Sequence, residues 1–195
     1  MPIKFVGDLS TSDAHILARV GTGKHVLEFG SGGSTQIFAQ VAKSVVSVET
    51  DEAWIARTQD NLGLLDSPAE VAFMPFEAMR YDQPYDVIFV DGVPDKRLQF
   101  ALAAWPCLTK GGVMLFHDTR RFEYMREAAW LMQLHFAEIS SVVINEADSN
   151  LTLLHKRHTP LHYVNWNDVE GKPAWAYGKA ERPYGADLWP LPDRA

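Results

Sequence analysis

The sequence predicts an α/β fold: a doubly wound, mostly parallel sheet of seven strands whose last strand is reversed, followed by an irregular C-terminal arm. Three observations support this fold class. Short apolar runs alternate five times with segments of helical periodicity, which implies parallel strands joined by right-handed crossovers. Two further apolar runs follow close together and predict an antiparallel hairpin. After residue 157 the periodicity stops.

The N-terminal part of the chain contains three predicted strands and three predicted helices. The first helix, over Asp13–Val20, follows the hydroxyl residues Ser10, Thr11 and Ser12, any of which can cap its free N–H groups. Short apolar runs predict the strands, and apolar residues at helical spacing predict the helices. The remaining elements in chain order are the strand His25–Phe29, the helix Ser34–Ala42, the strand Val45–Val48, the helix Asp51–Leu62 and the strand Val71–Met74.

The C-terminal part of the domain continues the alternation and then reverses it. The run Tyr85–Val90 is apolar at nearly every position, as expected for a strand that is buried on both faces. A helix predicted over Leu98–Leu108 ends at a glycine turn at residues 110–112. The remaining predicted elements are the strand Val113–Phe116, the helix Phe122–His135 and the hairpin strands Ile139–Ile144 and Leu151–His155.

We expect one domain over residues 1–157 and an arm over residues 158–195. The arm holds five of the eleven prolines and three of the six tryptophans. Prolines prevent long helices, and disordered tails are normally poor in large aromatic residues. The sequence therefore predicts an ordered, mostly non-helical arm that packs on the domain or on a second copy of the chain in a homo-oligomer. A lid over the functional site is the alternative interpretation.

The composition excludes several classes of protein. With 18 basic against 25 acidic residues, the chain lacks the clustered cations that a nucleic-acid footprint requires. Its apolar runs are far shorter than the ~20 residues of a membrane span, and its N-terminus lacks the apolar stretch of a secretory signal. Cys107 is the one cysteine, which excludes an intramolecular disulfide and a cysteine-based zinc cluster. We therefore expect a cytoplasmic protein that binds neither nucleic acid nor a membrane.

A glycine-rich turn, Gly30-Ser31-Gly32-Gly33, lies between a predicted strand and a predicted helix. Glycines allow a tight turn and a close approach of the backbone to a ligand, which then meets the free N–H groups of the helix. Glu49 follows Gly30 by nineteen residues, at the end of the next strand. A carboxylate at that place can accept hydrogen bonds from a ribose diol. The pattern predicts a nucleoside-containing ligand.

Two residues bear on which nucleoside is bound. The dinucleotide fingerprint G-x-G-x-x-G requires a third glycine, where this chain has Thr35. Glu28 would add negative charge beside a pyrophosphate, whereas it suits a ligand that carries an ammonium and a sulfonium. An oxidoreductase linked to NAD remains an alternative, as does a catalytically silent binding protein.

The stretch from Glu28 to Gly32 resembles motif I of the class I S-adenosylmethionine (SAM)-dependent methyltransferases, and the resemblance extends over about residues 10–157. Asp86–Gly92 is similar to motif IV of that family, and Lys110–Asp118 is similar to its fifth-strand region. The sequence motifs LEFGSGGST, FVDG and GGVMLFHDT are most similar to those of small methyltransferases of the methyltransferase-24 type. These enzymes are distantly similar to catechol-type O-methyltransferases.

The resemblance implies a Rossmann-like fold, SAM as the cofactor and a small-molecule acceptor, which we expect to be methylated on a hydroxyl group. Glu49 matches the family's ribose-binding acid, and Glu77-Ala78 matches the position near the adenine. The residues that the resemblance assigns to cofactor binding are Glu28, Gly30, Ser31, Gly32, Glu49, Glu77 and Ala78.

Asp91, His117 and Asp118 follow the predicted fourth and fifth strands, at the edge where open α/β sheets bind ligands. We expect all three to be catalytic, with His117 as the candidate general base because its ordinary pKa is near 6.5. The two aspartates could orient the acceptor or share a divalent cation. Catechol-type enzymes have a lysine where this chain has Pro94, and an asparagine where it has Thr119, so a metal is possible but is not assigned.

For residues 95–97 and for Trp54, we prefer a structural role to a functional one. We expect Asp95-Lys96-Arg97 to form a solvated face of the domain. Trp54 follows Glu49 closely enough to lie near the adenine, but a packing role is the preferred interpretation.

Overall fold

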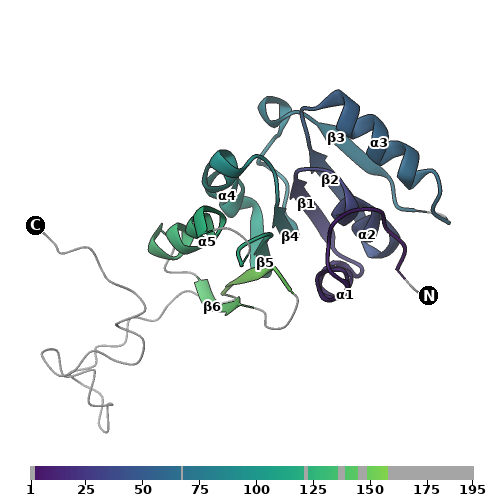
Figure 1. Ribbon diagram of the computed structural model, residues 1–195. Coiled ribbons are helices and arrows are strands. Elements are labelled where there is room, and N and C mark those ends of the chain that lie inside the picture. The colour runs from purple at the N-terminus through teal and green to yellow at the C-terminus, as the bar shows by residue number, and fades with distance from the viewer. Residues whose placement is uncertain (1–2, 67, 121–122, 136–138, 145–148, 158–195) are drawn as a thin grey trace, which may run out of the picture. The chain divides into compact units, whose positions relative to one another are not determined.

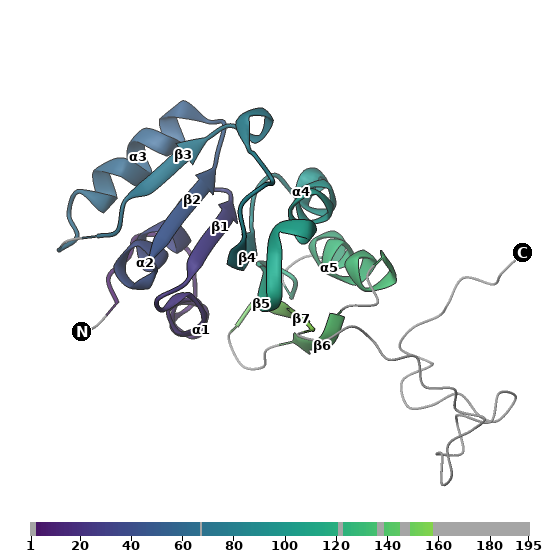
Figure 2. The same ribbon diagram turned by 180° about the vertical axis from the view of Figure 1, so that it is seen from behind.

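The computed structural model describes residues 3–66, 68–120, 123–135, 139–144 and 149–157. Its strands are β1 (His25–Phe29), β2 (Ser44–Val48), β3 (Val71–Met74), β4 (Tyr85–Val90), β5 (Leu108–Phe116), β6 (Ile139–Ile144) and β7 (Thr152–Lys156). They form one sheet in the order β3-β2-β1-β4-β5-β7-β6. Neighbouring strands are parallel except that β7 runs antiparallel to both β5 and β6. The predicted mostly parallel sheet with a reversed last strand is therefore confirmed (Figures 1 and 2).

Helices cover both faces of this sheet, as the doubly wound prediction requires. They are α1 (Thr11–Gly21), α2 (Gly33–Val41), α3 (Glu52–Leu62), α4 (Arg97–Ala104) and α5 (Glu123–His135). α1 and α2 pack on one face, with α3 beside α2, whereas α4 and α5 cover the other face (Figure 1). Within the described part of the chain, none of the helices has the length and apolarity that a bilayer crossing demands.

Local sequence explains where the helices begin. The Ser10 hydroxyl accepts a hydrogen bond from the Asp13 N–H at 3.0 Å and caps α1, as predicted for one of the three candidate residues. The Asp51 carboxylate accepts from the Trp54 N–H at 3.1 Å and caps α3, which therefore starts one residue later than expected.

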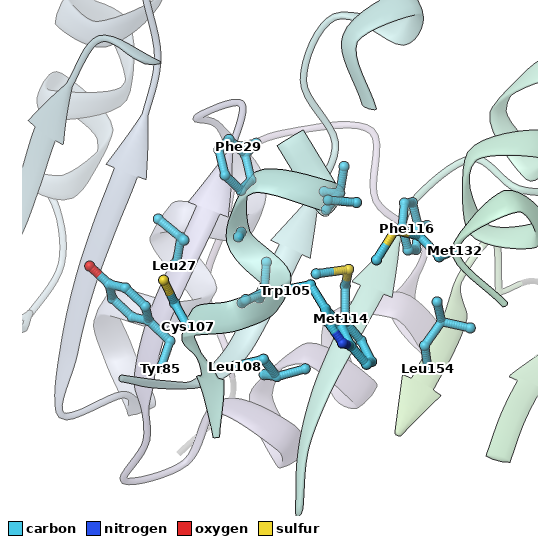
Figure 3. Packing of buried hydrophobic residues seen from close by; sticks show 14 of the residues in the cluster. Leu27, Phe29, Tyr85, Trp105, Cys107, Leu108, Met114, Phe116, Met132 and Leu154 are labelled. Carbon is cyan, nitrogen blue, oxygen red and sulfur yellow. The ribbon is translucent and has the colours of Figure 1, made fainter. Parts of the chain in front are cut away.

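The two cores follow from the alternation of side chains along the strands. In β1, Leu27 and Phe29 point toward α4 and α5 and are fully buried with Met114 and Phe116, as Figure 3 shows. Val26 points to the opposite face and packs with residues of α1 and α2. Because side chains alternate along a strand, Glu28 shares the face of Val26. This alternation places a carboxyl group beneath the start of α2.

One predicted segment is wrong. The helix expected over Leu98–Leu108 ends at Ala104 and passes through a single 3₁₀ turn, Trp105–Cys107, because Pro106 cannot continue an α-helix. The expected glycine turn at residues 110–112 lies inside β5. There the pairing with β4 jumps from Tyr85↔Leu108 to Val87↔Val113, so the extra residues form a bulge.

Two glycines fix how closely β1 and β4 approach at their carboxyl ends. Gly30 follows β1 and has a left-handed φ of 90°. A Cβ atom built on Gly30 would lie 2.9 Å from both the Cα and the N atom of Gly92, which follows β4 and Asp91. No real side chain fits at this distance from backbone, so the approach of the two turns requires glycine at position 30.

The C-terminal arm at residues 158–195 lies outside the described residues. The expected domain boundary, the packing or lid role of the arm and its part in a homo-oligomer therefore stay predictions.

We predict that Gly30→Ala destabilises the domain more than Gly23→Ala does. Gly23 also has a left-handed φ, of 67°, but a Cβ there meets no atom within 4 Å, so Gly23→Ala measures the conformational cost alone, about 1–2 kcal/mol. Gly30→Ala adds the backbone clash, which should cost about 1–3 kcal/mol more. Urea denaturation of the two variants checks this; equal losses would contradict the tight contact with Gly92.

Candidate functional site

The candidate site lies at the carboxyl edge of the sheet, where the strand order reverses between β1 and β4. Backbone hydrogen bonds bring the segments after neighbouring strands to the same level: the Asp91 N–H donates to Phe29 O at 2.9 Å, and the His117 N–H donates to Val90 O at 3.2 Å. Glu49 joins this edge through its N–H, which donates to Met74 O at 3.0 Å. Ligands of open α/β sheets bind at such a switch point.

The glycine turn forms an open cradle at the start of α2. Gly32 is the N-cap residue of α2, and its N–H donates to the Thr35 hydroxyl at 2.8 Å. A Cβ on Gly32 would meet only the side chain of Trp54 within 4 Å, at 3.7 Å or more. Thr35, which replaces the third fingerprint glycine, therefore serves to close the turn.

Glu49 lies directly beside this turn, as the sequence predicts. One of its carboxylate oxygens accepts from the Ser31 N–H at 3.2 Å, and the other accepts from the N–H groups of Thr50 at 2.8 Å and Asp51 at 3.0 Å. Three backbone donors thus fix the orientation of the carboxylate. The oxygen that accepts only from Ser31 keeps a lone pair for a ligand hydroxyl, whereas the other already accepts two hydrogen bonds.

Trp54 covers the turn, although the sequence favoured a simple packing role for it. Its indole N–H donates to the Ser31 carbonyl, its ring lies near Gly32, and Arg57 lies 5.1 Å from the ring centroid. The side chain nevertheless stays 43% exposed. Part of the Trp54 ring therefore faces solvent beside the glycine turn.

Glu28 lies fully buried beneath the turn. Its Oε2 accepts from the Ser34 hydroxyl at 2.9 Å, whereas its Oε1 makes no hydrogen bond within the described part of the chain. Burial raises the pKa of Glu28 to about 7, since the nearby hydroxyls of Thr35, Ser47 and Ser34 offset it only in part. A cationic donor that reached this carboxyl would favour its ionised form.

Glu77 and Ala78 lie apart from this group. They belong to the single 3₁₀ turn Phe76–Ala78 after β3, one strand beyond Glu49, and both are exposed. The turn lies at the same edge of the sheet as the glycine turn, but it follows the outermost strand β3, which β2 separates from β1.

The three predicted catalytic residues come together at the ends of β4 and β5. One polar atom from each of Asp91, His117 and Asp118 lies within 4.8 Å of the others. His117 Nδ1 is 3.2 Å from Asp91 Oδ1 and 3.8 Å from Asp118 Oδ1. Asp118 adopts a left-handed φ of 58°, a strained conformation that aspartate tolerates better than most residues.

The geometry does not fit the general-base role predicted for His117. Its side chain is 3% exposed, and Nε2 faces Asp13 Oδ2 at 3.6 Å on the side opposite Asp91. Burial alone would lower the pKa of His117, but the nearby Asp13 carboxylate and the hydrogen bond to Asp91 outweigh burial and raise it to about 10. An imidazolium that faces a carboxylate at each nitrogen has no free lone pair for a substrate proton, so we regard His117 as a residue that positions Asp91.

Sequence reasoning missed Asp13 and misread Arg97. Asp13, in α1, is fully buried and accepts from the Ser149 hydroxyl at 2.7 Å and the Asn150 N–H at 3.0 Å. Burial alone would raise the pKa of Asp13, but the nearby His117 imidazole and the hydrogen bonds from Ser149 and Asn150 hold it below its usual value. Asp95 and Lys96 are exposed as expected, whereas Arg97 is buried and forms an ion pair with Asp91 at 2.8 Å. Three consecutive charged residues, Asp95-Lys96-Arg97, give no indication in the sequence that only Arg97 is buried.

Comparison with known proteins identifies a methyltransferase domain in this chain. The model of a methyltransferase domain matches residues 27–119, a segment that includes the glycine turn, Glu49, Asp91 and Asp118. No curated protein matches the chain.

Solved structures with similar folds include three methyltransferases or methyltransferase-like proteins. A methyltransferase-like protein from Silicibacter pomeroyi is 22% identical, with 83% of this chain and 93% of that chain covered and a TM-score of 0.58. The O-methyltransferase from Bacillus cereus in complex with SAH is 19% identical, with 76% and 83% covered and a TM-score of 0.58. TomG, an O-methyltransferase from Streptomyces achromogenes involved in tomaymycin synthesis, in complex with SAM, is 14% identical, with 78% and 83% covered and a TM-score of 0.59. At these sequence identities, the similarity establishes a shared fold and no more.

We predict that His117 makes stability depend on pH in the alkaline range. Its pKa rises from 6.5 in the unfolded chain to about 10 in the folded one, so its stabilising contribution is complete below about pH 6.5 and is lost as the pH rises through 10. The wild-type protein should lose on the order of 3–5 kcal/mol across this range relative to His117→Gln. Urea denaturation at several pH values checks this, with the exposed His15→Gln as the control that keeps the wild-type slope. Parallel curves for wild type and His117→Gln would contradict it.

Proposed function

We propose that this chain, of which residues 27–119 match the model of a methyltransferase domain, is a class I SAM-dependent methyltransferase that transfers the methyl group of SAM to a hydroxyl group of a small-molecule acceptor. The observation that carries the proposal is the position of the Asp91 carboxylate. It lies at the switch point of the sheet, one backbone hydrogen bond away from β1, and its side chain is 28% exposed. A carboxylate there can orient a hydroxyl beside a ligand of the glycine turn.

The residues of the glycine turn fit SAM as the cofactor. Gly32 leaves room for a ligand where any larger residue would carry a side chain, and the N–H groups at the start of α2 border this space. Glu49, held by three backbone donors, can accept hydrogen bonds from the ribose hydroxyls. We assign the nucleoside to Gly30, Ser31, Gly32 and Glu49, and its adenine end to the turn that contains Glu77 and Ala78.

Glu28 supports a cofactor that carries positive charge. Its Oε1 lacks a hydrogen-bond donor within the described residues, although it is fully buried. Such a group is costly unless a ligand or water satisfies it. The ammonium group of SAM would supply a donor and a compensating charge, whereas a pyrophosphate would supply neither.

When bound, SAM provides a methyl group attached to a sulfonium, which is a good leaving group. The chain has to align the acceptor oxygen in line with that methyl group and to remove its proton. We assign both tasks to the carboxylates of Asp91 and Asp118, which can accept a hydrogen bond from the hydroxyl and then its proton. His117 is not part of this step because it lies beneath them.

A groove of about 390 Å³ between α4 and α5 supports a small acceptor. Its lining includes Pro94, which follows Asp91 by three residues in the chain, the apolar side chains of Leu98, Ala128 and Leu131, and the acidic Asp95 and Glu127. This volume lies within the range of pockets that hold small organic molecules. We place the apolar part of the acceptor there.

A screen for methyl transfer tests the proposed function directly. The purified full chain is incubated with SAM and with separate pools of phenols and alcohols, amines and thiols, and formation of S-adenosylhomocysteine (SAH) is measured. We expect SAH with the hydroxyl pool, and a loss of turnover in Asp91→Asn at unchanged SAH affinity. SAH formation with the amine or thiol pool alone would contradict the hydroxyl acceptor, and no turnover with any pool would favour a silent SAM-binding protein.

We predict that Glu49→Ala weakens the binding of SAH by about 1.5–3 kcal/mol, the worth of hydrogen bonds to a charged group. Isothermal titration calorimetry measures the change. The matched control is Glu52→Ala, which removes an exposed carboxylate three residues away and should alter the affinity by less than a few tenths of a kcal/mol. If Glu49→Ala also had so small an effect, the ribose would lie elsewhere.

We predict that Gly32→Val abolishes SAH binding while the domain stays folded. The new side chain enters the cradle, where it meets only Trp54 at an ordinary contact distance, so the added atoms obstruct the ligand and not the backbone. Circular dichroism and SAH titration check the two parts. Ala72→Val, on the exposed side of β3, is the control that should keep its affinity. Unchanged affinity in Gly32→Val would refute the placement of the cofactor.

A further inference from the structure

Arg97 is buried directly under the carboxyl edge of the sheet. Its side chain is 2% exposed, and every one of its nitrogen atoms has a partner. Nη2 donates to Asp91 Oδ1 at 2.8 Å and to Asp91 O at 3.2 Å, Nε donates to Gly92 O at 3.2 Å, and Nη1 donates to His117 O at 2.5 Å. The guanidinium thus binds both the side chain of Asp91 and the backbone that follows β4 and β5.

The carboxylate oxygen that Arg97 holds is shared with the imidazole of His117. Asp91 Oδ1 lies 3.2 Å from His117 Nδ1, so two nitrogen donors converge on one oxygen. The other side of the ring faces Asp13 Oδ2 at 3.6 Å. Together, Arg97 and His117 surround the inner side of the Asp91 carboxylate with positive charge and N–H groups.

This arrangement does not fit a divalent cation, although Asp91, His117 and Asp118 are residue types that bind metals and lie within 4.8 Å of one another. The guanidinium already occupies the inner oxygen of Asp91 with a fixed positive charge. A metal ion at that oxygen would lie against this charge, and Nδ1 could become a ligand only by giving up its contacts with Asp91 and Asp118.

We propose that Arg97 is a positioning residue that holds the Asp91 carboxylate in place and in orientation, a task that a divalent cation could otherwise perform, and that methyl transfer by this chain needs no metal ion. Arginine suits this task because its planar fork is always charged and binds carboxylate and carbonyl oxygens at once. The part of the inference that concerns turnover rests on the proposed function, whereas the part that concerns metal binding does not.

Binding of Mn²⁺ tests the inference without an acceptor. Electron paramagnetic resonance measures free Mn²⁺ in titrations of wild type, Arg97→Met and the double variant Arg97→Met/Asp91→Asn. Removing the guanidinium takes its fixed positive charge away from Asp91 Oδ1, so Arg97→Met should bind Mn²⁺ at least about tenfold more tightly than wild type. The double variant should lose this gain. Wild-type affinity equal to or tighter than that of Arg97→Met would overturn the inference.

Two further variants keep the test decisive if Arg97→Met does not fold, which circular dichroism reveals. Arg97→Lys keeps the positive charge and should bind Mn²⁺ as weakly as wild type. Asp118→Asn, whose side chain tolerates the left-handed φ at position 118, should also leave the wild-type titration unchanged. A wild-type Mn²⁺ site that disappears in Asp118→Asn would overturn the inference.

Turnover with a hydroxyl acceptor from the screen separates this inference from the proposed function. We expect the wild-type rate to stay the same after chelation with EDTA and after addition of Mg²⁺, and Arg97→Lys to lower kcat at least about tenfold with SAH affinity unchanged. Loss of activity with EDTA that Mg²⁺ restores would overturn the inference and leave the hydroxyl acceptor standing. Absence of turnover on every hydroxyl compound would refute the proposed function while the Mn²⁺ titrations still decide the role of Arg97.

Discussion

The buried imidazole of His117 joins the elements that form the functional edge of the sheet. Its ring lies between the carboxylates of Asp13 in α1 and Asp91 after β4, and its carbonyl accepts a hydrogen bond from Arg97 in α4. Buried charges are costly unless each is paired, so these residues stabilise one another only when α1, β4, β5 and α4 are all in place. The position of Asp91 therefore depends on the completed fold and not on β4 alone.

A second constraint acts on the other side of the switch point, where backbone meets backbone. Gly30 and Gly92 approach so closely that the glycine turn after β1 is held against the segment that carries Asp91. Packing of this kind fixes relative positions more strictly than contacts between flexible side chains, because neither turn can yield without moving a strand. The glycine turn and the segment that carries Asp91 are coupled through this contact.

Charge divides the edge into an inner and an outer part. The inner part holds the cations: Arg97 is saturated by Asp91 and backbone carbonyls, and His117 is enclosed by carboxylates. The outer part presents acidic groups, with Asp91 partly exposed and Glu49 oriented by backbone N–H groups. The acidic outer part suits a cationic cofactor because it attracts the sulfonium and ammonium groups. Asp91 does not depend on these groups for its orientation, since Arg97 and His117 of the inner part already hold it.

The sequence by itself determined those features whose physical cause is local. The bounds of β1, β3, β4 and β6 follow from apolar runs, the caps of α1 and α3 from Ser10 and Asp51, and the cradle from the glycines after β1, because each depends on residues that are neighbours in the chain. Only the tertiary structure decided the bulge in β5 and the partners at the edge. Asp13 meets Ser149 across 136 residues, and Arg97 is buried although the adjoining Asp95 and Lys96 are exposed. Whether a charged residue is solvated or buried, and whether a histidine is a base or an enclosed cation, depends on which distant groups surround it, and no local pattern carries that information.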